Sequence, residues 1–416
     1  MKSYFSLVII FVITAILSFI NQIVYAYYFG ADSSFDLLNA LVSLPFSIVG
    51  IGSGAISLLI MPILNDSKKK YGDCKTTLIN LIKKGLKYII VISIIITMIQ
   101  LYTFYDKVQD IYFNKFIKLT LLSGLFIFFT FLNTFFIIYF NFEKKFILAS
   151  TNAMFIYIFS ILLCVIFADT IGVDIVVYSL ILSNIFLFLI FILNFGYLNI
   201  SKINKEESKV NITSIEFFSS IFSILPFTLP VFIDSYFLLT LGDGYLSYVS
   251  YANKIIIMIS SILVQPLNII LFPKILERKD DILFIKNMIS KIYIFTFISF
   301  IIILLMTYAF FLDFMSLFFE NGNFTDNDSQ NVYSVFTIYL FGIIGMVCMN
   351  IQNKIINIYK FYKLQITLSI LFLFCYYSLM LTLTNILEFK ASGYSYAISW
   401  TLLSIIYFFI IYFKLK

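Results

Sequence analysis

Apolar stretches of about 20 residues recur along the whole chain, and short polar segments separate them. About 20 apolar residues in a helix are enough to cross the hydrocarbon core of a bilayer. We find twelve such stretches, centred near residues 16, 49, 96, 130, 157, 186, 228, 259, 300, 342, 376 and 403. The pattern predicts an all-α polytopic membrane protein with twelve transmembrane helices.

The composition supports a membrane protein. Hydrophobic residues make up 61% of the chain and charged residues only 12%, whereas soluble domains carry about 25% charged residues. Lysine-rich loops mark the cytoplasmic side of a membrane protein. With the N-terminus in the cytoplasm, 23 of the 28 Lys and Arg residues fall on that side. We therefore expect both termini in the cytoplasm, and the net charge of +6 reflects topology rather than nucleic-acid binding.

The two halves of the sequence resemble each other at a nearly constant offset. The segment from Phe19 to Asn21 recurs as Phe232 to Asp234, Gly30 recurs as Gly242, and Pro62 recurs as Pro273. Parallel six-helix repeats are one common plan of secondary transporters, in which the substrate site lies at the repeat interface. The pattern predicts two pseudo-symmetric six-helix bundles, residues 1–200 and 214–416, with a cytoplasmic linker at 201–213.

Motifs for enzyme chemistry are missing from the sequence. The chain has no histidine, no phosphate-binding P-loop, and four cysteines without metal-ligand or redox spacing. No outer loop is long enough for a catalytic domain. We expect a transporter rather than an enzyme, without a resident metal or cofactor. Its energy would come from the membrane potential, from the gradient of a coupling ion, Na⁺ or H⁺, or from the substrate gradient.

One basic residue, Lys254, lies deep inside an apolar stretch. A cation in the bilayer costs a few kcal/mol or more and is retained where it meets an anion, a cavity or a polar partner. Other polar residues are expected at similar depth, in the outer half of the membrane. The candidate substrate-binding residues are Lys254, Asn253, Asn21, Gln22, Asp234, Asp36 and Asn39. Asp234 and Lys254 could instead neutralise each other as an interhelical pair, and the sequence leaves both interpretations open.

Prolines and glycines interrupt the second, seventh and eighth stretches. Proline removes a backbone donor and bends a helix, which membrane helices tolerate where neighbours or water satisfy the freed carbonyl. The predicted hinge residues are Pro45, Gly50, Gly52, Gly54, Pro226, Pro230 and Pro266. The glycines could also allow close helix packing, and the same glycine can be a hinge and a packing position.

Three stretches carry a family resemblance. They are Phe29-Gly30-Ala31 with Asp36, Pro45, Gly54 and Pro62; Gly242 through Tyr251-Ala252-Asn253-Lys254 to Pro266 and Pro273; and Leu317 to Thr325 followed by Gly342. At these residues the chain resembles the MurJ/MviN lipid II flippases and the Wzx-type flippases. Both belong to the multidrug/oligosaccharidyl-lipid/polysaccharide exporter superfamily, which also includes cation-coupled multidrug exporters.

The resemblance implies two six-helix bundles around a central cavity, working by alternating access. It implies a monomer in the bacterial inner membrane that moves an undecaprenyl-diphosphate-linked saccharide to the outer leaflet. Asn21-Gln22 and Asn253-Lys254 stand where the lipid II flippases have Arg-Asp and Asp-Arg, so an O-antigen or capsule repeat unit is expected alongside lipid II. Lys254 would hold the diphosphate. The alternative is a Na⁺- or H⁺-coupled multidrug exporter with Asp234 and Asp36 binding the ion, but Lys254 would repel its cationic cargo.

Overall fold

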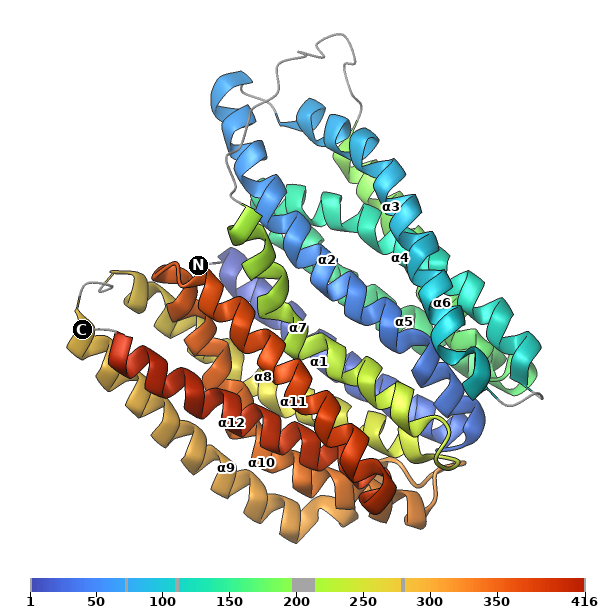
Figure 1. The fold of residues 1–416 in the computed structure, drawn as a ribbon. Coiled ribbons are helices and arrows are strands. Elements are labelled where there is room, and N and C mark those ends of the chain that lie inside the picture. Colours follow the sequence, from blue (N-terminus) through green and yellow to red (C-terminus); the bar gives the residue numbers. More distant parts are fainter. Residues whose placement is uncertain (1, 72–73, 109–111, 197–213, 278–280, 415–416) are drawn as a thin grey trace. The chain divides into compact units, whose positions relative to one another are not determined.

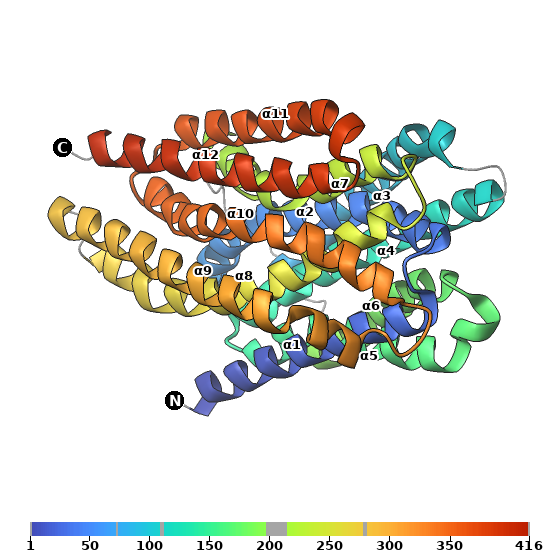
Figure 2. The same ribbon diagram turned by 90° about the horizontal axis from the view of Figure 1, so that it is seen from below.

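The computed structural model describes residues 2–71, 74–108, 112–196, 214–277 and 281–414. These residues form twelve α-helices and one short 3-10 helix, with no β-strand among them (Figures 1 and 2). In chain order they are α1 (Lys2–Phe29), α2 (Ser33–Tyr71), α3 (Lys75–Phe104), η1 (Tyr105–Lys107), α4 (Phe113–Phe142), α5 (Phe146–Ile171), α6 (Asp174–Phe195), α7 (Ser214–Leu238), α8 (Tyr245–Glu277), α9 (Ile282–Phe318), α10 (Asp326–Ile358), α11 (Tyr362–Leu387) and α12 (Lys390–Lys414). Every predicted stretch is centred within the corresponding helix, so the all-α prediction is confirmed.

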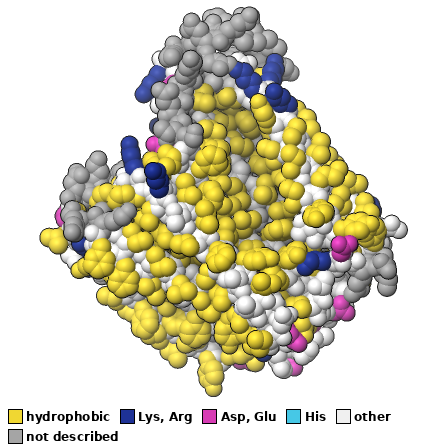
Figure 3. All heavy atoms as spheres, viewed as in Figure 1, with side chains coloured by type: hydrophobic (Ala, Val, Ile, Leu, Met, Phe, Trp, Pro, Cys, Tyr) yellow, Lys and Arg dark blue, Asp and Glu magenta, His cyan; other side chains and the backbone are white. Residues whose placement is uncertain are grey.

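Helices form here because lipid offers the backbone no hydrogen-bond partners, and a helix satisfies its own N–H and C=O groups. Among the described residues, eleven helices are long and apolar enough to cross a membrane. The remaining helix, α8, has 33 residues and carries Lys254. Hydrophobic side chains cover most of the face shown in Figure 3. Large apolar residues such as Leu193 and Phe374 are 79% and 71% exposed, as expected for side chains that face lipid.

The chain divides into two compact units. Unit 1 comprises Met1–Phe29 and Ala40–Ile224, and unit 2 comprises Gly30–Asn39 and Leu225–Lys416. The boundaries fall at the end of α1, within α2 and within α7. The predicted linker, 201–213, lies outside the described residues, so the predicted domain limits remain a prediction.

Unit 1 is organised around α4, which packs against α3, α5 and α6. Its buried side includes Phe131, Phe136 and Phe140. Polar groups within this core bind one another: Asn133 Nδ2 donates to the Asn184 carbonyl at 2.9 Å, and the Thr130 hydroxyl donates to Asn184 Oδ1 at 3.2 Å. Since an unsatisfied polar group in an apolar interior is costly, these bonds fix the register of α4 against α6.

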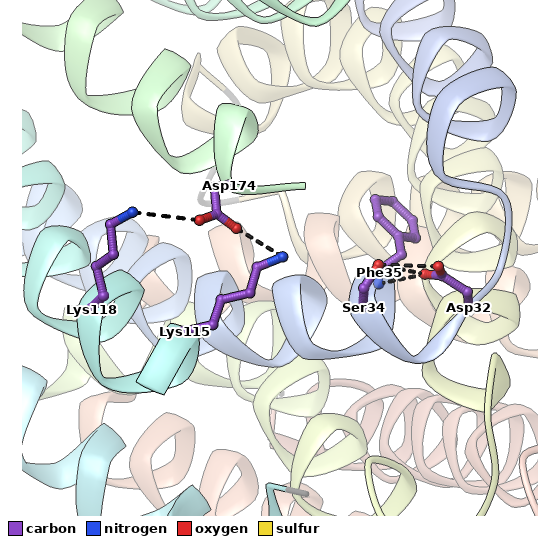
Figure 4. A network of polar contacts seen from close by, with 6 residues as sticks. All are labelled: Asp32, Ser34, Phe35, Lys115, Lys118 and Asp174. Carbon is purple, nitrogen blue, oxygen red and sulfur yellow. Dashed lines mark hydrogen bonds and ion pairs between the residues drawn. The ribbon is translucent and has the colours of Figure 1, made fainter. Parts of the chain in front are cut away.

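Two lysines at one end of unit 1 share a carboxylate. Lys115 Nζ and Lys118 Nζ, on the first turns of α4, lie 2.9 Å and 3.7 Å from the oxygens of Asp174 at the start of α6 (Figure 4). Both lysines belong to the side predicted to be outside. The shared carboxylate compensates part of their positive charge, and the orientation of the chain in the membrane remains a prediction.

The glycines of α2 allow close packing within unit 1. A Cβ on Gly52 would lie 2.3 Å from the Phe131 ring, and a Cβ on Gly54 would lie 2.4 Å from Ile224 Cδ1. Small residues of this kind let membrane helices approach each other, so the packing role is confirmed for both. Pro45, Pro226, Pro230 and Pro266 lie within continuous helices, together with Gly50. The hinge function of these seven residues remains a prediction.

Unit 2 is organised around α10, which packs against α8, α9, α11 and α12. Figures 1 and 2 both show α9, α10 and α12 side by side. The approach of α10 to α12 is very close, because a Cβ on Gly345 would lie 2.3 Å from the Trp400 carbonyl oxygen. The fourth helix of each half, α4 or α10, is therefore central to its unit.

We expect Gly345→Ala to destabilise unit 2, because the added methyl group meets the α12 backbone, which cannot rotate away. Overpacking of this kind costs about 1–3 kcal/mol. Gly393→Ala is the matched control, since its Cβ would meet the Ile338 side chain at 3.1 Å. Thermal unfolding in detergent should show a clear loss for Gly345→Ala and a small change for Gly393→Ala. Equal midpoints would contradict the packing argument.

Candidate functional site

The first group of candidate site residues in unit 2 lies at the start of α8. Gly244, the residue before α8, has a φ of +82°, a conformation that glycine adopts without steric cost. Its N–H donates to Asp36 Oδ2 at 2.7 Å, and the Ser247 N–H donates to Asp36 Oδ1 at 2.6 Å. The Ser247 hydroxyl also donates to Oδ1. Asp36, only 2% exposed, thus caps α8 from the first turn of α2.

A second contact follows one turn further along both helices. The Ser250 hydroxyl donates to Asn39 Oδ1 at 3.0 Å. Asn39 Nδ2 is buried without a hydrogen-bond partner. Asp36 and Ser247, like Asn39 and Ser250, are 211 residues apart, close to the offset of the sequence repeat. The start of α2 is therefore aligned with its counterpart in the second repeat.

Lys254 lies on the same face of α8, four residues beyond Ser250. Nine residues of helix place it about 14 Å along the axis from Tyr245. Its side chain is exposed, whereas Asn253 beside it is half-buried. Among the described residues, no ion pair or hydrogen bond involves Lys254. Its role in binding a ligand remains a prediction.

Asp234 does not neutralise Lys254. Its side chain is 2% exposed, and Oδ1 accepts a hydrogen bond from the Tyr376 hydroxyl at 2.7 Å. The alternative of an interhelical Asp234–Lys254 pair is therefore not what the structure shows within unit 2. Because the carboxyl group of Asp234 is hydrogen-bonded to the Tyr376 hydroxyl, it does not compensate the charge of Lys254.

Aromatic residues brace the same end of unit 2. The Tyr251 hydroxyl donates to the Gly30 carbonyl at 2.9 Å, and its ring stacks on Phe35 and meets Phe324 edge-on. The Tyr248 hydroxyl donates to Asp328 Oδ1 at 3.0 Å. Asp328 Oδ2 accepts the N–H and hydroxyl of Thr325 at the start of α10. The stretch from Leu317 to Thr325 therefore helps to position α8.

Asn21 and Gln22 belong to unit 1, on α1. Asn21 is 3% exposed, and its Oδ1 is buried without a hydrogen-bond partner. Gln22 is half-buried. Their participation in a site with Lys254 remains a prediction. Within unit 2, the structure brings Asp36 and Asn39 together with the α8 face that carries Lys254.

The sequence did not indicate several functional candidates. Ser247 and Ser250 bind the two polar residues of α2, and Tyr376, Ser392 and Tyr339 form the surroundings of Asp234. Serine and tyrosine are frequent in this chain, so composition does not single these residues out. The spacing of Ser247, Ser250 and Lys254 along one helix face was the available signal.

Comparison with known proteins decides the family. The family model described as "Lipid II flippase MurJ" matches residues 25–416. The chain belongs to the MurJ family. Its members are lipid-linked saccharide flippases, which are transporters and not enzymes. The match includes Lys254 and begins after Asn21 and Gln22.

Solved structures agree with the MurJ family in fold. "Lipid II flippase MurJ, inward closed conformation" has a TM-score of 0.76 at 16% identity, over 98% of this chain and 89% of that chain. The MATE transporter VcmN of Vibrio cholerae has a TM-score of 0.59 at 14% identity, over 99% of this chain and 96% of that chain. A transporter of the MOP superfamily from Pyrococcus furiosus has a TM-score of 0.57 at 14% identity, over 98% and 95%. No curated protein is similar enough to the chain to count as a match.

Proposed function

We propose that this chain moves an undecaprenyl-diphosphate-linked saccharide from the inner to the outer leaflet of the bacterial inner membrane by alternating access. Membership of the lipid II flippase family supports this cargo. The observation that carries the proposal is Lys254, an exposed and unpaired cation on α8. A diphosphate is the charged part of such a lipid and the natural partner of an ammonium group. Lipid II and O-antigen or capsule repeat units share this group.

The proposed substrate contacts are of two kinds, one made by an ammonium group and the others by side-chain amides. The Lys254 ammonium would form charge-assisted hydrogen bonds to the diphosphate, the strong type of hydrogen bond in proteins. The amides of Asn253, Asn39, Asn21 and Gln22 would bind phosphate or sugar hydroxyls. Three hydrogen-bond donors of the protein itself bind the Asp36 carboxylate, so its burial does not require a bound substrate.

The membrane potential can supply the direction of transport. An inside-negative potential drives a dianion outward, and this movement is downhill by about 2.3 kcal/mol per charge per 100 mV, roughly 4–5 kcal/mol for both charges at 100 mV. We also propose that the protein works as a monomer with both termini in the cytoplasm. Impermeant labelling of the termini in cells and mass measurement in detergent check these two points.

The proposed function is tested in proteoliposomes that contain the purified chain and lipid II with a fluorescent saccharide. We expect protein-dependent movement of the label to the opposite leaflet, detected with an impermeant quencher. The rate should rise with a potential of the favourable sign, because the diphosphate is anionic.

A neutral lipid carrying the same saccharide is the matched control, and its movement should not respond to the potential. A capsule or O-antigen repeat unit on the same lipid carrier measures the saccharide preference. Absence of movement for every diphosphate-linked saccharide, together with export of a cationic dye, would favour the multidrug exporter instead.

A further inference from the structure

Pro45 leaves one carbonyl group of α2 without its usual backbone donor. In an α-helix each carbonyl accepts a hydrogen bond from the N–H group four residues further on, and proline has no N–H. Within α2 the carbonyl affected is that of Leu41, a residue that is 1% exposed. A buried carbonyl without a donor costs free energy. This carbonyl therefore needs a donor from elsewhere in the protein.

A glutamine of α3 supplies that donor. Gln100 Nε2 donates to the Leu41 carbonyl. Gln100 is fully buried, and its Oε1 accepts from the Ser123 hydroxyl of α4 at 3.3 Å. These three residues all belong to unit 1. A buried amide is costly unless it is hydrogen-bonded, and here both ends of the amide are bound. The side chain of Gln100 thus links the turn of α2 before the proline to α3 and α4.

The same stretch of α2 has two serines that bond to their own helix. The Ser43 hydroxyl donates to the Ala40 carbonyl at 2.7 Å, and the Ser47 hydroxyl donates to the Ser43 carbonyl at 2.8 Å. Serine side chains that bond to the preceding turn in this way often bend helices. With Pro45 between the two serines, residues 40–47 form a segment in which α2 depends on side chains for part of its hydrogen bonding.

This segment begins where α2 passes from one compact unit to the other. Unit 2 includes α2 up to Asn39, and unit 1 includes it from Ala40. Within unit 2, Asp36 and Asn39 bind the start of α8. Within unit 1, Gln100 binds the next turn through the Leu41 carbonyl. Hydrogen bonds from each unit therefore hold adjacent turns of α2, directly before the proline.

We infer that Gln100 is a positioning residue for transport, an inference that rests on the alternating access of the proposed function. By replacing the donor that Pro45 removes, its amide keeps the Leu41 turn attached to unit 1 while the segment 40–47 bends. The first two turns of α2, which α8 holds, would then move with unit 2 during transport. A backbone N–H at position 45 would satisfy the same carbonyl, but it would stiffen the helix. The glutamine thus maintains stability at a point where the proline provides flexibility.

A double-mutant cycle tests the hydrogen bond without substrate. Gln100→Leu should lower the midpoint of thermal unfolding in detergent by a few degrees, because a buried carbonyl loses its donor. In the Pro45→Ala background the same change should have little effect, because the new N–H binds the Leu41 carbonyl. Ser123→Ala is the matched control and should change the midpoint little, since it leaves the Gln100 donor in place. An equal loss from Gln100→Leu in both backgrounds would overturn the inference.

The transport rate separates positioning from a simple loss of stability. In the proteoliposomes, Pro45→Ala and Gln100→Leu should each lower the maximal rate several-fold. The lipid concentration at half-maximal rate should stay unchanged, because the inference gives neither residue a contact with the substrate. The double variant should regain the stability of Pro45→Ala without regaining the rate. A stable Pro45→Ala variant that transports at the wild-type rate would overturn the inference.

Distance measurement by electron paramagnetic resonance follows the movement itself. Tyr102 of unit 1 and Tyr308 of unit 2 are 88% and 84% exposed. Tyr102→Cys and Tyr308→Cys can therefore carry spin labels once the four native cysteines are replaced. Pro45→Ala should narrow the distribution of distances between the labels, and Gln100→Leu should broaden it. Identical distributions in all three backgrounds would overturn the inference. If no lipid-linked saccharide moves in the wild type, the proposed function fails, while the midpoints and distances still decide the role of Gln100.

Discussion

Replacing Lys254 with Gln is expected to abolish growth of a flippase-depleted strain that depends on this chain. The substitution removes the charge but keeps a polar side chain of similar length. A hydrogen bond to a charged group is worth about 1.5–3 kcal/mol, so transport should fall by roughly 10- to 150-fold. Lys254→Arg should retain part of the activity, because the charge remains while the geometry of the donors changes. Complementation and the proteoliposome rate are the two measurements.

Lys291→Gln is the matched control, because Lys291 is also an exposed lysine within a helix, α9. Its loss should leave growth and transport unchanged. Protein amount in the membrane must be equal for all variants, which immunoblotting measures. Full activity of Lys254→Gln would remove Lys254 from the mechanism and with it the main support for an anionic cargo.

The sequence predicted the fold because the membrane limits the alternatives. Backbone groups in lipid must be satisfied within the segment, so an apolar stretch of sufficient length becomes a helix. The positions of all twelve helices followed from this rule alone. The repeat predicted from the sequence remains a prediction, while α4 and α10 are each central to their units.

The candidate site was predictable only in part. Lys254 stands out in any apolar sequence, and the structure leaves it exposed and unpaired. The partners of Asp234 were not predictable, because Tyr376 is 142 residues away and one of 29 tyrosines. Periodicity says which face of a helix is buried, but not which hydroxyl on another helix meets a carboxyl group. The partners of a charged side chain within the membrane could therefore be identified only from the tertiary structure.

Asp36→Ala is expected to destabilise the protein strongly. Asp36 accepts two backbone N–H groups and one hydroxyl at the start of α8. Each buried donor left without a partner costs about 1–3 kcal/mol, so the loss is at least about 3 kcal/mol. The midpoint of thermal unfolding in detergent measures it. Because α8 carries Lys254, transport should fall together with stability.

Asp32→Ala provides the matched comparison, since Asp32 also caps a helix N-terminus but is exposed. Its Oδ1 accepts from the Phe35 N–H at 2.8 Å and from the Ser34 hydroxyl at 2.9 Å (Figure 4). Removing an exposed cap of this kind costs about 1 kcal/mol. A midpoint for Asp36→Ala as high as that of Asp32→Ala, with transport lost, would instead assign Asp36 to substrate binding. The ratio of lost stability to lost transport therefore separates a residue that positions α8 from one that contacts the saccharide.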